Sequence, residues 1–434
     1  MIFPFARKFV ACFASYALWC ACVLTAAPAL AASEPVGELS LRHAIDAALT
    51  HNPDLTVSSY ELKVAEARVT QAGLRPNPQA SVEFENFIGT GETSGIKSLE
   101  TTLSLSQTIE LGGKRGFRVS TAALGGELTG VVRQAQQLDV LAEVTRRFID
   151  VVSAQQAVSL AQRATGLTEQ SLAAITARVA AARTPLAEQS RATIAVTRAR
   201  IEQQQAEKTL QGKRRALAAL WGGRTAAFSS ASAELFTLPT VQPFETLSAR
   251  LQGNPDFLRF ATEARLRDAE WRLAQSQAKP NLNVGIGIRR FEATDDAALV
   301  AGFSIDLPVF NRNQGVIREA EVRREQLRVQ SQAALIRAEA TLFGLYQELL
   351  SARASVETLR TDAIPQAEAA LLQTQDGYER GRFSYLELAA AQQELLGLQG
   401  TAIEAAADYH RFLAEIERLT NLALTHDSLE ATQP

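Results

Sequence analysis

The chain has 434 residues, of which 46% are hydrophobic and 21% charged, so its length allows one large domain or two to three ordinary ones. Its 44 Lys and Arg residues against 47 Asp and Glu residues give a formal net charge of -3, and no long block of one sign occurs. This balance argues against nucleic acid as a partner. Abundant alanine with only 6% aromatic residues favours long, closely packed helices over a thick globular core.

The first 32 residues have the features of a secretory signal peptide. Arg7 and Lys8 precede an apolar run over residues 9–27, and small residues follow up to Ala32, where we expect cleavage. A retained transmembrane helix is the less favoured alternative. The cysteines and the single methionine all lie in this segment, so the exported chain is expected to lack disulfides, thiolate metal sites and a lipid-anchoring cysteine. No later run of about 18 apolar residues predicts a membrane-spanning helix.

Several sequence landmarks occur twice, in the same order. Asn52-Pro53-Asp54 returns as Asn254-Pro255-Asp256, Arg75-Pro76-Asn77-Pro78 as Lys279-Pro280-Asn281-Leu282, Leu103-Ser104-Leu105 as Phe303-Ser304-Ile305, and Ala177-Arg178-Val179 with Leu186 as Gly377-Tyr378-Glu379 with Leu386. This pattern indicates a tandem duplication. We expect repeats over residues 33–221 and 244–425, a linker over 222–243 and a short tail over 426–434.

Each expected repeat contains two strands followed by a helical hairpin. Apolar and polar residues alternate over residues of about 79–88, 98–109, 282–291 and 298–309, which predicts strands with two different faces. About ten residues is the length that crosses an outer membrane at a tilt of about 45°. A half-buried hairpin in a soluble sandwich remains open from the strands alone. Two hairpins cannot close a barrel, so a membrane location would require several chains to share one.

The helical hairpins are predicted over residues of about 113–221 and 315–421. No proline occurs between Pro78 and Pro185, and the helical pattern from Gly113 to about Arg183 corresponds to a length of roughly 100 Å. The second long helix should be kinked at Pro365. The return helices are about half as long, so we expect shorter helices before the strands to stack on their ends. An exported coiled-coil rod is the alternative.

The Asn52-Pro53 opening, the two-fold repeat and the segment from Gly377 to Leu388 resemble the TolC-like outer-membrane factors over residues 39–425. These proteins are the exit ducts of tripartite efflux pumps and type I secretion systems. The segment from Gln107 to Arg115 is similar to the strand-to-helix junction of the heavy-metal branch, which has CzcC- and CusC-type members.

The resemblance implies a mainly α fold with a small β part. Long helical hairpins would form a trimeric periplasmic α-barrel, and four strands per chain would contribute to a shared twelve-stranded outer-membrane β-barrel. It also implies a homotrimer, surrounding outer-membrane lipid, a periplasmic membrane-fusion adaptor and an inner-membrane pump of the RND type. The implied cargo is divalent heavy-metal cations, with multidrug export or type I secretion as alternatives. A non-channel exported structural or adaptor protein is less favoured.

The same resemblance assigns candidate residues at the periplasmic end of the expected duct. The periplasmic tips would contact the adaptor through Arg178, Ala181, Pro185 and Leu186 in the first hairpin and through Tyr378, Gly381, Tyr385 and Leu386 in the second. Arg178 and Ala181 replace the family's Tyr and Gly at the first tip. Glu387 would form an acidic ring at the channel mouth, where it would favour cations.

The alternation of the strands assigns two sets of barrel residues. Glu83, Glu85, Glu100, Arg289 and Asp306 are expected to face the lumen. The expected lipid-facing set is Val82, Phe84, Leu99, Leu103, Leu105, Val284, Ile286, Ile288, Phe303 and Ile305.

No catalytic or cofactor-binding motif is found in the sequence. His43, His51, His410 and His426 are scattered and match no metal-binding spacing, and the glycines at 89, 91 and 95 miss the dinucleotide-binding pattern. We therefore expect a passive duct with no cofactor and no enzymatic activity.

Overall fold

The computed structural model describes residues 35–422. The expected signal peptide over residues 1–32 and the tail over 426–434 lie outside this range. The helices are α1 (Leu41–His51), α2 (Pro53–Ala72), α3 (Lys114–Ala180), α4 (Leu186–Ala218), α5 (Phe244–Arg250), α6 (Pro255–Gln277), α7 (Gln314–Thr358), α8 (Ile364–Glu379) and α9 (Tyr385–Thr420). The strands are β1 (Gly37–Leu39), β2 (Gln79–Glu85), β3 (Glu100–Glu110), β4 (Phe228–Ala231), β5 (Asn281–Phe291) and β6 (Asp296–Ile305).

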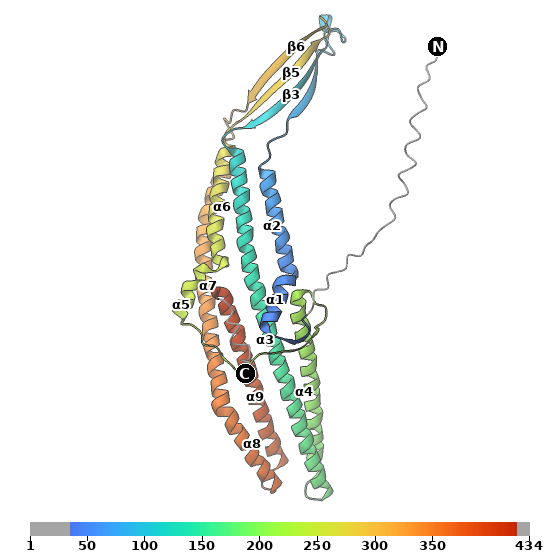
Figure 1. Ribbon diagram of the computed structural model, residues 1–434, viewed down its shortest axis with the longest axis vertical. Coiled ribbons are helices and arrows are strands. Elements are labelled where there is room, and N and C mark those ends of the chain that lie inside the picture. Colours follow the sequence, from blue (N-terminus) through green and yellow to red (C-terminus); the bar gives the residue numbers. More distant parts are fainter. Residues whose placement is uncertain (1–34, 423–434) are drawn as a thin grey trace, which may run out of the picture. The chain divides into compact units, whose positions relative to one another are not determined.

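The long strands form one antiparallel sheet in the order β2-β3-β5-β6, so β3 pairs with β5 from the distant second half of the chain (Figure 1). The strand bounds differ from the sequence expectation by up to four residues, most at the ends of β2 and β6. β2 stops at Glu85, before Asn86 enters the left-handed region with φ 57°. β6 stops at Ile305 rather than at 309, since Ile305 pairs with Leu282 and β5 begins only one residue earlier, at Asn281.

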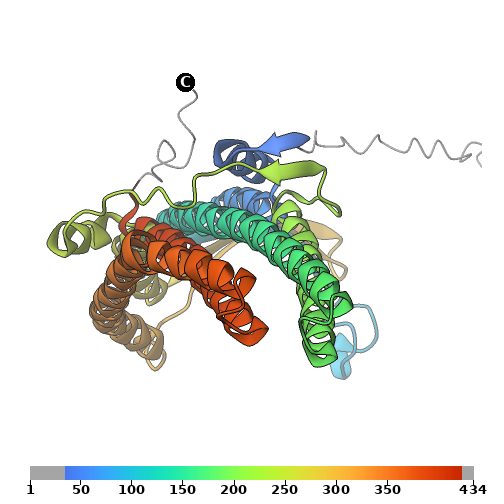
Figure 2. The same cartoon turned by 90° about the horizontal axis from the view of Figure 1, so that it is seen from below.

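The helices continue the sheet as a curved layer of four columns (Figures 1 and 2). Next to the sheet the order is α2, α3, α6 and α7; farther away α4 replaces α2, α9 replaces α6, and α8 continues α7. Within residues 35–422, α3 alone runs unbroken from the sheet to the far turns, and its 67 residues correspond to about 100 Å.

Two asparagines join helices that stack end to end in one column. The sequence predicts such stacking, because the return helices are shorter than the long helices. Asn52 is the N-cap of α2, where its Oδ1 accepts from Asp54 N at 2.9 Å. Its Nδ2 donates to Leu220 O, in the 3₁₀ turn Ala219–Trp221 that follows α4, at 2.9 Å. Asn254 does the same for α6 and α9: Nδ2 donates to Arg418 O at 2.6 Å. Each buried side chain thus satisfies free backbone groups of two helix ends.

The fourth column departs from a regular α-helix near Pro365, where the sequence predicts a kink. A π-helical turn, Leu359–Ala363, lies between α7 and α8 and ends two residues before this proline. Proline has no N–H and its ring collides with the carbonyl four residues earlier, so the wider turn absorbs the conflict without ending the helix.

The buried core lies among the helices. Around Phe148 and Trp221 it includes the small parallel β1–β4 sheet, and a second cluster surrounds Leu342 and Tyr409. The segment 222–243, expected as a linker, is packed onto α9: Tyr409 donates from its hydroxyl to Pro239 O, and the His410 ring lies 2.9 Å from Leu235 O. Within residues 35–422 no helix is both long and apolar enough to cross a membrane.

Candidate channel surfaces

The large sheet has one apolar face that no other element of the described chain covers. The strand register places Val82, Leu103 and Ile288 side by side in one row and Leu105 beside Ile286 in the next. Exposed fractions reach 65% for Ile286 and 82% for Phe303. All residues of the expected lipid-facing set share this face except Leu99, which lies just before β3.

The other face of the sheet is polar and cross-linked by hydrogen bonds. Arg289 lies between two carboxylates: its Nη2 is 2.7 Å from Glu85 Oε2 and its Nη1 is 2.9 Å from Glu100 Oε2. Glu85 and Glu100 are directly opposite each other on β2 and β3, where two negative charges would repel without this guanidinium. Glu83 lies on the same face, and Asp306 follows the end of β6.

The two turns at the far ends of the helical hairpins have the same backbone hydrogen bonds. In the α3–α4 turn Arg183 N donates to Arg178 O, and in the α8–α9 turn Arg382 N donates to Gly377 O. The left-handed residue is Ala182 in the first turn, φ 55°, and Gly381 in the second, φ 74°. The sequence match that paired Ala181 with Gly381 is therefore wrong by one residue, because the turn geometry selects Ala182.

Arg178 and Tyr378, which the sequence match treated as equivalents, contact each other. Arg178 Nη1 donates to Tyr378 O at 2.8 Å, and the guanidinium lies 4.6 Å from the centre of the Tyr378 ring. Tyr378 and Tyr385 pack with Ile175 in a buried cluster that joins the two hairpins. Burial raises the pKa of the Tyr378 hydroxyl, partly offset by Arg178.

The remaining tip residues surround this contact. Pro185 is the N-cap of α4, while Leu186 and Leu386 are exposed at 67% and 64%. Gly377 has no room for a side chain, because a Cβ would lie 2.2 Å from the Phe383 ring.

Glu387 is exposed and part of a capping box at the start of α9. Its Oε2 accepts from Ser384 N at 2.7 Å and from Ser384 Oγ at 2.9 Å. These bonds, that from the backbone N–H first, lower the pKa of the Glu387 carboxyl. The carboxylate expected at the channel mouth therefore also stabilises its own helix end.

No set of three or more His, Cys, Asp or Glu side chains with metal-binding geometry occurs among the described residues. His43 and His51 are exposed on α1, His410 is buried in α9, and His426 lies outside the described range.

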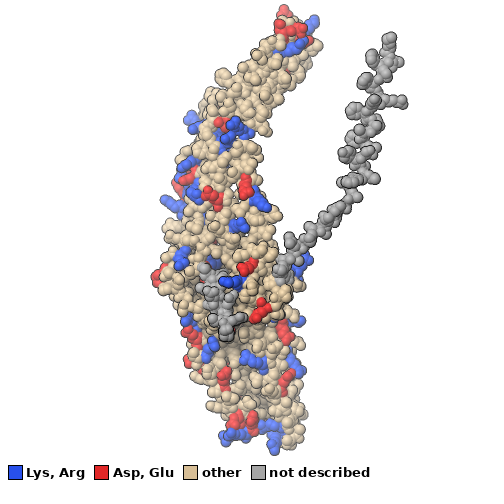
Figure 3. Space-filling model, viewed as in Figure 1, with Lys and Arg blue, Asp and Glu red and all other residues tan. Residues whose placement is uncertain are grey.

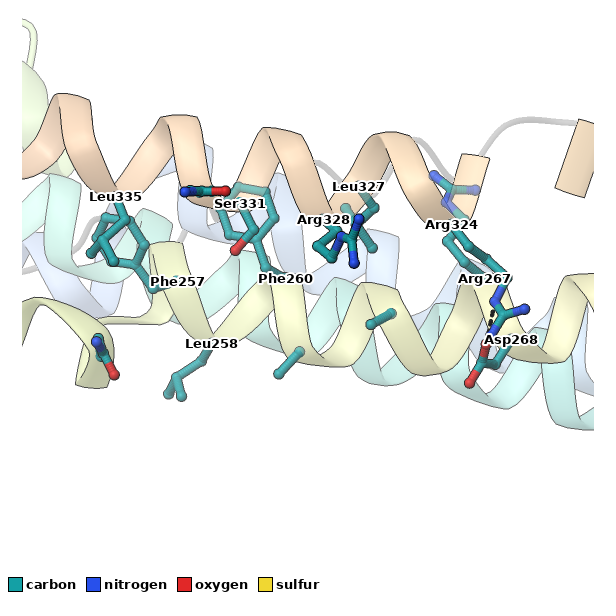
Figure 4. A pocket seen from close by; sticks show the side chains of 14 residues that line it. Phe257, Leu258, Phe260, Arg267, Asp268, Arg324, Leu327, Arg328, Ser331 and Leu335 are labelled. Atoms are coloured by element: carbon teal, nitrogen blue, oxygen red, sulfur yellow. Dashed lines mark ion pairs between the residues drawn. The ribbon is translucent and has the colours of Figure 1, made fainter. Parts of the chain in front are cut away.

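A groove of about 740 Å³ lies between α6 and α7, and sequence reasoning did not predict it (Figure 4). Phe257 and Phe260 point from α6 toward Leu327 and Leu335 of α7. The small residues Ala261 and Ala264 of α6 leave this space open. No sequence motif marks the groove, because it depends on how α6 and α7 pack against each other.

Solved structures of two bacterial membrane proteins have the same fold as this chain. CusC aligns with a TM-score of 0.73 at 17% identity, covering 88% of this chain and 91% of that one. The outer membrane protein VceC from Vibrio cholerae aligns with a TM-score of 0.72 at 20% identity, covering 88% and 95%.

The chain belongs to the outer membrane efflux protein family, whose profile matches residues 44–223 and 246–422. The cobalt-zinc-cadmium resistance protein CzcC of Cupriavidus metallidurans is 30% identical over 387 residues, which cover 88% of this chain and 91% of that protein. The nickel-cobalt-cadmium resistance protein NccC of Alcaligenes xylosoxydans xylosoxydans is 22% identical over 65% of each chain.

These matches confirm the expected family, its heavy-metal branch and the outer-membrane location with a helical periplasmic extension. They also confirm the mostly helical TolC-like fold with a small sheet.

Proposed function

We propose that three copies of this chain form a closed duct through the outer membrane. The observation that carries the proposal is the four-stranded sheet, which has two unpaired edges, at β2 and β6, and an uncovered apolar face. Pairing β6 of one copy with β2 of the next removes every edge and yields a twelve-stranded barrel. Lipid would then cover the apolar face, and Arg289 with its carboxylates would face the lumen.

The outer helix columns support the same assembly. On α7 an apolar residue is exposed at every seventh position: Val322, Val329, Ile336, Phe343 and Leu350. The opposite column exposes Val57, Tyr60 and Val64 on α2 and Ile194 and Ile201 on α4. Two different apolar flanks on one molecule are the requirement for a ring of identical subunits, and a period of seven is typical of helix pairing. The matching halves of the chain support a tandem duplication as its origin.

We infer that the duct exports divalent heavy-metal cations, together with a periplasmic adaptor at the hairpin tips and an RND-type inner-membrane pump. CzcC and NccC carry such metals in their names. The duct itself contributes no chemistry. It would act as neither enzyme nor tight metal binder, since conduction requires weak binding and easy release.

Three copies of Glu387 would lie around the axis at the periplasmic mouth and favour cations over anions. The test is the reversal potential of the purified trimer in a salt gradient across a planar bilayer. Glu387→Gln should lower cation selectivity, whereas Glu394→Gln, farther along α9, should leave it unchanged. An unchanged reversal potential for both variants would exclude the selectivity role.

The whole proposal is tested by deleting the gene and restoring it. Loss should sensitise the cell to one or more of Co, Zn, Cd, Ni and Cu, and purified protein should migrate as a trimer that dissociates on heating. Sensitivity to organic antibiotics with unchanged metal tolerance would instead assign the chain to multidrug export. Submicromolar zinc binding by the trimer would contradict a passive duct.

A further inference from the structure

Each of the four junctions between sheet and helices carries an exposed basic side chain. Arg75 lies between α2 and β2, Arg115 begins α3 after β3, Lys279 lies between α6 and β5, and Arg312 lies between β6 and α7. Within residues 35–422 none of the four forms an ion pair with a carboxylate. In the space-filling view Lys and Arg side chains gather where the sheet meets the helices, below a sheet surface almost free of charge (Figure 3).

The carboxylates in or beside these junctions are fewer than the basic residues. Glu110, at the end of β3, is paired with Arg118 of α3, and the charges of Lys114 and Arg115 also act on it. Asp306, at the start of the β6–α7 junction, is the other acidic residue in these segments. The junctions therefore carry a net positive charge beside the uncovered apolar face.

The junction between β6 and α7, residues 306–313, adds an apolar surface at the same level. Phe310 is 91% exposed, Leu307 75% and Val309 58%. The conformation of this loop is fixed by hydrogen bonds. Asn313 Nδ2 donates to Ala274 O at 2.7 Å and Gln314 Nε2 donates to Phe310 O at 3.2 Å. Burial inside the chain therefore does not account for these side chains, which follow Ile305 along the chain at the end of the sheet.

We propose that this surface, formed by Arg75, Arg115, Lys279, Arg312 and the apolar residues of the loop 306–313, binds anionic phospholipid headgroups of the periplasmic leaflet. An aromatic side chain beside unpaired cations fits the boundary between acyl chains and headgroups. Lysine and arginine near an anionic lipid surface are attracted to it, and the effect falls off within a Debye length. This inference rests on the proposed outer-membrane duct.

The experiment uses the full trimer refolded into vesicles, with Phe310→Trp as a fluorescent reporter of the loop. The vesicles contain phosphatidylglycerol and phosphatidylcholine in equal mole fractions. In one preparation the phosphatidylglycerol is brominated and in the other the phosphatidylcholine, so that the brominated lipid quenches nearby tryptophan. The parent chain, with Trp221 and Trp271, supplies the background signal. We expect brominated phosphatidylglycerol to quench the reporter about two-fold more strongly than brominated phosphatidylcholine at low salt.

The combined variant Arg75→Gln, Lys279→Gln, Arg312→Gln should reduce this ratio to about one. The matched control replaces three exposed basic residues of other helices, Arg42 of α1, Arg163 of α3 and Arg250 of α5, with Gln and should keep the ratio. If both lipids quench Phe310→Trp equally while the basic residues are intact, the proposal is overturned. Quenching by neither lipid would also overturn it, because it would show that another copy covers the loop.

A Phe310→Trp protein that conducts in a planar bilayer but shows no lipid preference refutes only this inference. A protein that neither inserts nor conducts refutes the duct itself.

Discussion

The orientation of the sheet makes a quantitative prediction at the centre of β3. Leu105 is the middle residue of this strand, half exposed on the apolar face between Ala80 and Ile286. Leu105→Arg would place a guanidinium near the middle of the bilayer, at a cost of about 2 to 4 kcal/mol per chain. A closed trimer contains three such sites, so the cost for the assembly is about three times larger.

The neighbouring residue is the matched control. Ser106 lies on the polar face opposite Gly285, which has no side chain to obstruct a longer residue. Ser106→Arg adds the same charge to the same strand, but its guanidinium would lie in the watery lumen. We expect its free energy of unfolding to remain within about 0.5 kcal/mol of the parent.

The assay is urea unfolding of the refolded trimer in phospholipid vesicles, followed by the heat-sensitive mobility of the trimer on gels. The unfolding midpoint should fall for Leu105→Arg and stay close to the parent for Ser106→Arg. Equal stability of the two variants, or a larger loss for Ser106→Arg, would show that the apolar face does not contact lipid.

Three further predictions concern the helical part. Ala182→Gly should raise and Gly381→Ala lower the free energy of unfolding by about 1 kcal/mol, because only glycine adopts the left-handed turn conformation without steric strain; changes of the same sign in chemical unfolding would contradict this. Asn254→Ala should cost about 1 to 2 kcal/mol through loss of a cap shared by two helices, whereas exposed Asn77→Ala should cost little. Burial lowers the pKa of His410 in the folded chain, and the hydrogen bond to Leu235 O partly offsets this. On acidification the unfolded chain therefore binds the proton first, so the free energy of unfolding should fall as the pH drops below about 6.5. His410→Gln should weaken this pH dependence, and an identical pH profile for the variant would exclude His410 as its source.

The alternation of Leu282 to Ile288 and of Leu299 to Ile305 was enough to predict strands and to sort their two faces, because a period of two reports local geometry. The pairing of β3 with β5 was not predictable from the pattern, since it joins segments almost two hundred residues apart. Strand ends also escaped prediction where a single residue, Asn86, adopts a left-handed conformation.

The functional surfaces divide in the same way. Residue type and alternation were sufficient to place Glu85, Glu100 and Arg289 on one face, but their ion pairs depend on a register that only the folded sheet fixes. The contact between Arg178 and Tyr378 escaped prediction because aligning two similar turns treats these residues as equivalents, whereas the fold makes them neighbours. The groove between α6 and α7 likewise depends on how far apart two helices lie.

The unbroken α3 has a mechanical consequence. The other three columns each contain a discontinuity, at Asn52, at Asn254 and at the π-helical turn before Pro365, where hydrogen bonding departs from the regular helical ladder. A torque on the hairpin ends can be absorbed at these joints by small rotations. Because α3 has no such joint, we expect it to keep the distance between the sheet and the turns constant while the neighbouring helices rotate.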